Sequence, residues 1–252
     1  MIKNSFCFLP SANIEIEKLL WKSGFFEWND FLDSTVHSKP LDTKKTKALE
    51  TELEYALSQY DAENSAYFYS KLPEKESWRL FKDFEKKAMF LDIESTGLGL
   101  NDKTTVFGYS FNGKFKTLIR GQELSKKTLV ELLKKAKILI TFNGTQFDIP
   151  FLEKEFNLNI NIPQIDLRFV GYELGLKGGL KNIETQIGLK RSNKVQGLNG
   201  FAAIKLWQQH LRGNNKSLEL LIEYNRLDVQ NLETIMKQYY EKLKEKRMKK
   251  FS

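Results

Sequence analysis

The hydrophobic pattern changes character after residue 86. Up to that point the apolar residues recur at helical spacing, interrupted by a polar segment at 34–47. The predicted helices of this part span 14–21, 28–32, 46–61, 64–71 and 74–86. From residue 88 onward, short apolar runs of strand length alternate with helical patterns. We therefore expect a helical N-terminal region at 1–86 and a second domain at 87–252.

The second domain combines a hairpin with later strands and helices. Its predicted strands span 88–93, 104–111, 114–119, 137–142 and 165–167. Asn112-Gly113 stands between the second and third strands and is a strong hairpin signal. The predicted helices span 125–136, 147–156, 167–174, 179–187, 200–211 and 216–247. This order predicts an α/β fold in which helices flank both faces of a mixed sheet.

The distribution of charge distinguishes the two parts. Residues 1–86 carry 12 Lys and Arg against 15 Asp and Glu, whereas residues 87–252 carry 28 against 17. The basic excess of the second part favours an anionic partner, with nucleic acid as the first candidate. A generally lysine-rich composition is the alternative. For the acidic N-terminal region, a helical cap on the core is preferred over a module that binds nucleic acid or a partner.

The remaining composition narrows the class of protein. Cys7 is the single cysteine, so we expect neither an intramolecular disulfide nor a cysteine-held zinc ion. The sequence has no apolar run of 18 or more residues, and its start lacks the pattern of a signal peptide. We expect a cytoplasmic protein without a membrane partner. The sequence leaves the oligomeric state open.

Candidate chemistry begins at the end of the first strand. Asp92 and Glu94 are two residues apart in a strand, so their carboxylates lie on one face and repel each other. Asp148 follows another buried strand, and Asp228 shares a helix face with Tyr224 four residues earlier. Divalent cations bound through oxygen ligands offset such repulsion. Taken singly, these acids also suit ordinary roles, such as a strand end or a helix N-cap.

The ordered set of motifs resembles a known superfamily. Asp-x-Glu, then Asn-Gly-x-x-Phe-Asp, then Tyr-x-x-x-Asp is similar to the DEDD (DnaQ-like) 3′–5′ exonuclease superfamily, which has a ribonuclease H-like fold. The tyrosine subtype is indicated, because Glu223 occupies the position of the histidine in the other subtype. The chain most resembles the YprB-like exonucleases over about residues 88–235. The matching stretches are FLDIESTGL, ITFNGTQFDIPFL, LKNIETQIGLKR and EYNRLDVQNL.

The resemblance implies a site and a reaction. Two Mg²⁺ or Mn²⁺ ions would be held by Asp92, Glu94, Asp148 and Asp228, and Tyr224 would orient the attacking water. The substrate would be the 3′ end of a single strand, with DNA favoured over RNA. The residues that would bind it are Thr96, Gly97, Asn143, Phe147, Lys190 and Arg191. For the last two, a solvated loop is an equal alternative.

Three interpretations stay open beside this one. A non-catalytic module that binds nucleic acid or a partner on the same fold is the alternative function. Asp166 is interpreted as part of a structural turn rather than as a further metal ligand. The stretch 237–250 carries seven Lys and Arg against two Glu, which suits either phosphate contacts or a solvated, frayed tail.

Overall fold

The computed structural model describes residues 1–35, 38–99, 101–190 and 197–249. The chain divides into two compact units. One comprises Met1–Glu85 and Tyr240–Ser252, and the other comprises Lys86–Tyr239. The end of the last helix therefore belongs to the unit of the N-terminal residues, and the predicted domain boundary at residue 87 stays a prediction.

The first unit is built from short helices. These are α1 (Ile14–Lys22), α2 (Trp28–Leu32), α3 (Thr43–Asp61), α4 (Ser65–Lys71) and α5 (Leu80–Phe84), with 3-10 turns η1 (Ile2–Asn4), η3 (Glu74–Arg79) and η4 (Glu85–Lys87). Asn13 caps α1 by accepting from two backbone amides. Asp42 caps α3, so this helix begins inside the segment expected to be a linker.

The predicted helix at 74–86 is instead split into η3, α5 and η4. A 3-10 turn aligns side chains three residues apart, and this is the spacing of Glu76 and Arg79. The Arg79 Nε donates to Glu76 Oε2 at 2.7 Å. A buried ion pair thus accompanies the departure from a regular α-helix.

Arg79 is the centre of a buried polar network. Its guanidinium is fully buried and donates to both carboxylate oxygens of Glu17 at 2.9 Å. It also donates to the Ser5 hydroxyl at 2.9 Å. Arg247, near the end of the last helix, pairs with Glu76. The network therefore joins segments from both ends of the chain within this unit.

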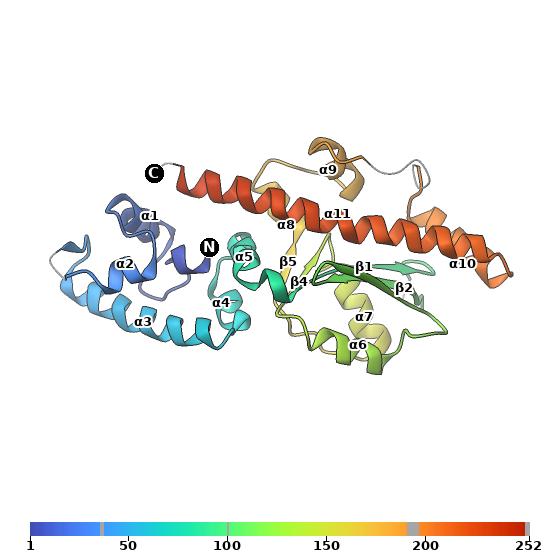
Figure 1. Cartoon of the computed structure of the whole chain (residues 1–252), viewed down its shortest axis with the longest axis horizontal. Coiled ribbons are helices and arrows are strands. Elements are labelled where there is room, and N and C mark those ends of the chain that lie inside the picture. Colours follow the sequence, from blue (N-terminus) through green and yellow to red (C-terminus); the bar gives the residue numbers. More distant parts are fainter. Residues whose placement is uncertain (36–37, 100, 191–196, 250–252) are drawn as a thin grey trace. The chain divides into compact units, whose positions relative to one another are not determined.

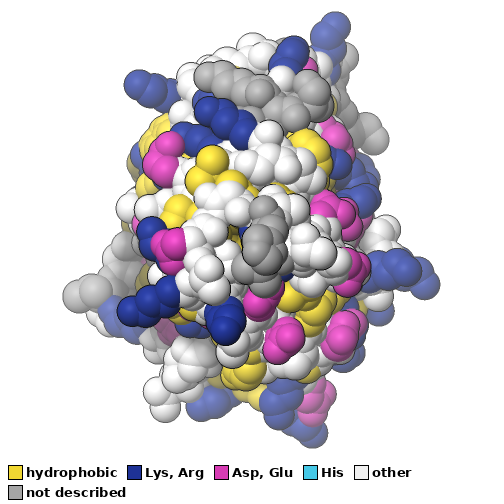
Figure 2. Space-filling view, turned by 90° about the vertical axis from the view of Figure 1, so that its left-hand side faces the viewer, with side chains coloured by type: hydrophobic (Ala, Val, Ile, Leu, Met, Phe, Trp, Pro, Cys, Tyr) yellow, Lys and Arg dark blue, Asp and Glu magenta, His cyan; other side chains and the backbone are white. Residues whose placement is uncertain are grey.

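The basic C-terminal stretch is ordered by the same unit. The last helix, α11 (Asn215–Met248), continues to Met248, so the stretch is helical rather than frayed as far as the structure describes it. The Tyr240 ring is buried, with centroids 5.8 Å from Trp78 and 5.9 Å from Phe81. On the face that Figure 2 shows, Lys and Arg are interspersed with Asp and Glu. Phosphate contacts by this stretch stay a prediction.

The second unit contains the predicted mixed sheet. Its strands are β1 (Ala88–Ser95), β2 (Thr104–Phe111), β3 (Lys114–Ile119), β4 (Ile138–Thr141) and β5 (Gln164–Asp166), in the order β3-β2-β1-β4-β5. Strands β1, β2 and β3 are antiparallel, whereas β4 runs parallel to both β1 and β5. The expected mixed sheet flanked by helices, with a helical N-terminal region before it, is confirmed.

Different helices cover the two faces of the sheet. Figure 1 shows α6 (Lys126–Leu133) and α7 (Asp148–Phe156) on one side and α11 on the other. Met89, Leu91 and Ile93 of β1 pack in one core cluster with residues of α6 and α7. Val106 of β2 packs in a second cluster with residues of α10 (Gly200–Leu211) and α11. Side chains alternate along a strand, so Asp92 and Glu94 face the α10–α11 side.

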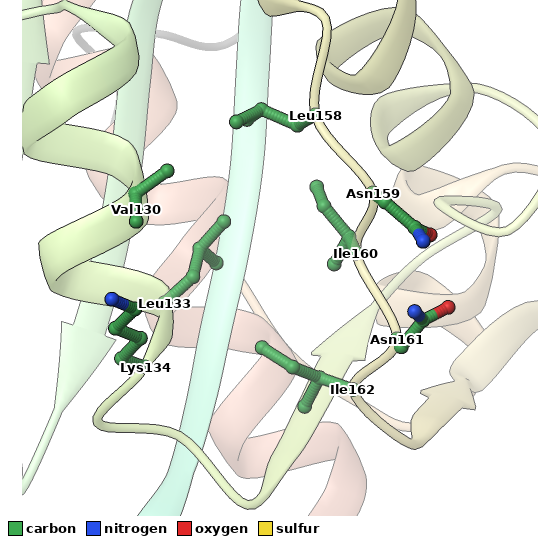
Figure 3. Close-up of a pocket in the computed structure, with 8 residues that line it drawn as sticks. All are labelled: Val130, Leu133, Lys134, Leu158, Asn159, Ile160, Asn161 and Ile162. Carbon is green, nitrogen blue, oxygen red and sulfur yellow. The ribbon is translucent and has the colours of Figure 1, made fainter.

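An apolar cavity of about 200 Å³ lies on the α6–α7 side. Figure 3 shows Leu158, Ile160 and Ile162 pointing toward α6, whereas Asn159 and Asn161 point away from it. Val130 and Leu133 of α6, and Lys134 directly after it, also line the cavity. The cavity opens on the face of the sheet away from Asp92 and Glu94, so we give it no role in the site below.

The buried network predicts the largest stability effect in the first unit. Arg79→Met leaves Glu17 and Glu76 buried without their central cation, and the free energy of unfolding should fall by about 3–5 kcal/mol. Urea unfolding of the purified protein measures this change. The control is Lys82→Met, which removes an exposed pair with Glu85 and should change the value by less than about 1 kcal/mol. Equal effects of the two changes would contradict the assignment.

Candidate metal centre

Three acidic side chains from two elements converge beside the sheet. Asp92 and Glu94 come from β1, and Asp228 comes from α11. Each offers a carboxylate oxygen, and these oxygens all lie within 4.8 Å of one another. Glu94 and Asp228 are buried and Asp92 is half-buried. Glu94 Oε1 is buried without a hydrogen-bond partner. An all-oxygen set with an unpartnered carboxylate oxygen fits a hard divalent ion such as Mg²⁺ or Mn²⁺.

The close approach of α11 to the sheet depends on a glycine. Gly108 of β2 pairs with Asp92 in the strand register. A Cβ atom on Gly108 would lie 1.6 Å from Asn225 Oδ1, so any other residue would displace the Asn225 side chain. Asn225 Nδ2 donates to Asp92 Oδ2 at 2.9 Å and to the Asp92 carbonyl oxygen at 3.1 Å.

The sequence interpretation missed both Gly108 and Asn225. A glycine inside a strand often marks the close approach of another backbone or side chain, and this signal was available. Asn225 lies three residues before Asp228 on the helix, close to the same face.

Asp148 lies next to this set rather than in it. It begins α7, is buried, and its Oδ1 accepts from the Ile93 amide at 3.1 Å. The structure thus fixes its carboxylate against β1, beside the strand that carries Asp92 and Glu94. Direct or water-mediated metal binding by Asp148 stays a prediction.

Burial and mutual repulsion disfavour the charged forms of these acids. Burial raises the pKa of Asp92 and of Glu94 well above their usual range, and the charges of Asp228 and Asp148 raise both further. Burial also raises the pKa of Asp148 to about 7, although the hydrogen bond from Ile93 opposes the shift. A bound cation would reverse this preference, because it favours the ionised carboxylates.

Tyr224 lies one helical turn before Asp228. Its side chain is buried in the cluster formed by α10, α11 and β2. The Lys181 Nζ, from α9 (Leu180–Gln186), lies 5.0 Å from the centroid of the Tyr224 ring. The Lys181 charge also lowers the pKa of Glu94, against the larger effect of burial. One cation of the chain therefore stands beside the acidic set.

The loop after β1 contains Thr96 and Gly97 and folds around Asp102. The Thr96 hydroxyl donates to Asp102 Oδ1 at 2.7 Å, and the Gly99 amide donates to Oδ2 at 2.6 Å. A Cβ atom on Gly97 would lie 2.5 Å from Asp102 Oδ2. These contacts hold backbone groups at the strand end that bears the acids. Contact with a 3′ end stays a prediction.

Asn143 stands in the turn between β4 and α7 with φ +64°. Its amide donates to Asp166 Oδ1 at 2.7 Å, and its Oδ1 accepts from Arg168 Nη1 at 2.6 Å. Asp166 also accepts from the Thr145 amide and hydroxyl and caps α8 (Leu167–Tyr172). Asp166 thus organises the turn, the structural role considered for it above.

Of the remaining predicted substrate residues, the structure describes Phe147 and Lys190. The Phe147 ring is half-buried and lies 5.5 Å from the Phe151 ring, against the core cluster of the α6–α7 face. Lys190 is exposed after α9, and Arg191 lies outside the described residues. Arg226, a further basic residue of α11, pairs with Glu223 on its own helix at 2.6 Å.

A comparison with protein families identifies the superfamily of this fold. A family model described as RNase_H superfamily matches residues 89–240, which is more than half of the chain. The protein therefore belongs to the RNase H superfamily, whose nuclease-like fold implies nucleic-acid binding.

A solved structure with a related chain is Brucella melitensis NrnC. It is 19% identical, has a TM-score of 0.44, and the match covers 68% of this chain and 81% of that one. No curated protein matches the chain. Among the described helices, none has both the length and the apolar character needed to span a membrane.

The raised pKa values predict a pH-dependent stability of the metal-free protein. An acid whose folded pKa is raised binds more protons folded than unfolded, so stability falls as pH rises through that window. For Asp148 the window runs from 3.8 to about 7. The melting temperature in chelator should therefore be higher at pH 5 than at pH 8, by about 2–4 °C per kcal/mol.

Thermal unfolding across this pH range measures the slope. Mn²⁺ at pH 8 should restore the lost stability of the wild type. Asp92→Asn should flatten the slope because it removes one repelling charge. A melting temperature that rises steadily from pH 5 to pH 8 in chelator would contradict the prediction.

Proposed function

We propose that the protein is a metal-dependent 3′–5′ exonuclease that hydrolyses phosphodiester bonds at the end of a single strand, with DNA favoured over RNA. The observation that carries this proposal is the convergence of the Asp92, Glu94 and Asp228 carboxylate oxygens within 4.8 Å. The superfamily supports a nuclease, and the motif order in the sequence supports the exonuclease subtype. The catalytic domain in this proposal is 87–252. The cytoplasmic location expected from the sequence stays a prediction.

The acids have distinct positions in the proposed site. Asp92, Glu94 and Asp228 would hold the ions through carboxylate oxygens that lie within 4.8 Å of one another. Asp148 would complete the second position through water. When bound, two divalent ions stabilise the charge on the reacting phosphoryl group and lower the pKa of the attacking water.

Tyr224 has a different role in the proposal. It shares a helix face with Asp228 and its ring is packed beneath Lys181, which limits its rotation. Its hydroxyl would hold the attacking water by a hydrogen bond and so orient it toward phosphorus. The proposed substrate contacts are Thr96, Gly97, Asn143, Phe147, Lys190 and Arg191.

The direct experiment uses end-labelled single- and double-stranded DNA and RNA with Mg²⁺ or Mn²⁺. Release of mononucleotides from the 3′ end of single-stranded DNA is the expected result. Label released first from a 5′ end would contradict the polarity. Binding of nucleic acid without any cleavage would favour a non-catalytic module on the same fold.

The metal ligands should be essential for cleavage and dispensable for folding. Asp92→Asn and Asp228→Asn each remove a ligand and a repelling charge, so turnover should fall below detection while metal-free stability holds or rises. The matched control is Glu233→Gln, which changes an acid on α11 that pairs with Lys237. Its turnover should equal that of the wild type. Near-normal turnover of either Asn variant in Mg²⁺ would refute the site.

Tyr224→Phe isolates the role of the hydroxyl. The ring and its packing are kept, so kcat should fall about 10–1000-fold while Mn²⁺ affinity is unchanged. Single-turnover rates at saturating Mn²⁺ and calorimetric Mn²⁺ titration measure the two quantities. A parallel loss of Mn²⁺ affinity would show that Tyr224 supports the metal ligands instead.

A further inference from the structure

A buried amide braces the central acid of the site. Asn225, on α11, is fully buried. Its Nδ2 group donates to Asp92 Oδ2 at 2.9 Å and to the Asp92 carbonyl oxygen at 3.1 Å. One amide therefore ties the Asp92 carboxylate to the Asp92 backbone. Such a bridge restricts rotation about the side-chain bonds of Asp92.

The orientation of this amide follows from its partners. A flipped amide would direct its carbonyl oxygen at two acceptor oxygens of Asp92, which is repulsive. With Nδ2 toward Asp92, however, the Asn225 Oδ1 is buried without a hydrogen-bond partner. An apolar side chain at this position would avoid that unsatisfied oxygen. Asn225 is therefore better suited to orient the Asp92 carboxylate than to stabilise the fold.

The sheet is shaped to admit the same amide. Gly108 is the strand partner of Asp92, and its missing Cβ is the space that Asn225 Oδ1 fills. Even alanine at Gly108 would place a carbon 1.6 Å from this oxygen. Gly108 and Asn225 therefore form a matched pair, in which the missing Cβ of Gly108 leaves room for the buried Asn225 amide.

We propose that Asn225 is a positioning residue that holds the Asp92 carboxylate in the orientation required for metal binding. The missing side chain of Gly108 provides the space for the Asn225 amide. The inference rests on the proposed metal-dependent function. Asn225 donates to Asp92 Oδ2, so the lone pairs of the other Asp92 oxygen are kept for a metal ion. Residues that orient metal ligands in this way commonly alter metal affinity 10–100-fold when replaced.

The main test compares Mn²⁺ binding to the wild type and to Asn225→Leu, which keeps the number and branching of the side-chain heavy atoms and removes the donor. Mn²⁺ affinity, measured by the electron paramagnetic resonance signal of free Mn²⁺, should fall about 10–100-fold. The melting temperature in chelator should hold or rise, because the unsatisfied oxygen is gone. Turnover at low Mn²⁺ should fall, and raising Mn²⁺ should restore most of it.

The chain provides a matched control on the same helix. Asn231 donates from Nδ2 to Glu184 Oε1 at 2.8 Å, so it is also an amide that holds a buried carboxylate. Glu184 is not one of the three converging acids. Asn231→Leu should leave Mn²⁺ affinity unchanged. Equal losses in Asn225→Leu and Asn231→Leu would mean that any disturbance of α11 weakens binding, and would overturn the inference.

A double-mutant cycle tests the role of Gly108. It also tests the proposal if Asn225→Leu folds poorly. Gly108→Ala alone should displace Asn225 and weaken Mn²⁺ binding about as much as Asn225→Ala. In the Asn225→Ala background the added methyl group has room, so Gly108→Ala should cause little further loss. Additive losses would show that the two residues act separately, against the proposal.

The possible outcomes distinguish the positioning role of Asn225 from the proposed metal-dependent function. If the wild type binds Mn²⁺ and the Asn225 variants bind it equally well, the positioning role is wrong and the metal centre stands. If the wild type binds no Mn²⁺, the metal centre fails and the positioning role fails with it. Weaker binding in the Asn225 variants with normal binding in Asn231→Leu supports both.

Discussion

Repulsion among enclosed carboxylates is the constraint on which the second unit depends. Asp92 and Glu94 share one face of β1, and α11 adds Asp228 to the same space. The surrounding groups lessen this repulsion without removing it. Asn225 donates to Asp92, the Ile93 amide donates to Asp148, and the Lys181 charge acts on Glu94. The pKa values of Asp92 and Glu94 nonetheless stay well above their usual range, so the set retains a strong preference for an added positive charge.

This constraint also explains how closely the layers must be packed. A carboxylate on a strand and one on a helix converge only if the helix axis comes near the sheet, and side chains on the strand normally prevent that. Gly108 removes the obstacle beside Asp92, while Val106 two residues earlier still packs against α10 and α11. Apolar contacts thus hold α11 on one side of the acids. On the other side, Gly108 leaves room for the Asn225 side chain of that helix.

The parts of this arrangement that follow local rules could be predicted from the sequence. Strand alternation placed Asp92 and Glu94 on one face, and Asn112-Gly113 marked the β2–β3 hairpin that the structure contains. Helical spacing placed Tyr224 beside Asp228. The role of Asn225 could not be predicted in this way, because its partner lies 133 residues away and mid-helix asparagine carries no local signal. The 3-10 turn at Glu74–Arg79 was missed for the same reason, since its ion pairs involve Glu17 and Arg247.

The two units resolve the burial of acids in opposite ways. In the first unit, Arg79 pairs with both Glu17 and Glu76, and Arg247 pairs with Glu76, so two cations of the chain match these two acids without an outside cation. A chain with 40 Lys and Arg has ample cations for a second internal solution. Around Asp92 it instead places a neutral amide, and it leaves Glu94 Oε1 buried and unpartnered. A structural ion-pair network would be completed like that of Arg79. Acids that the cations of the chain leave incompletely paired, like those around Asp92, are what a site for an exchangeable metal ion requires.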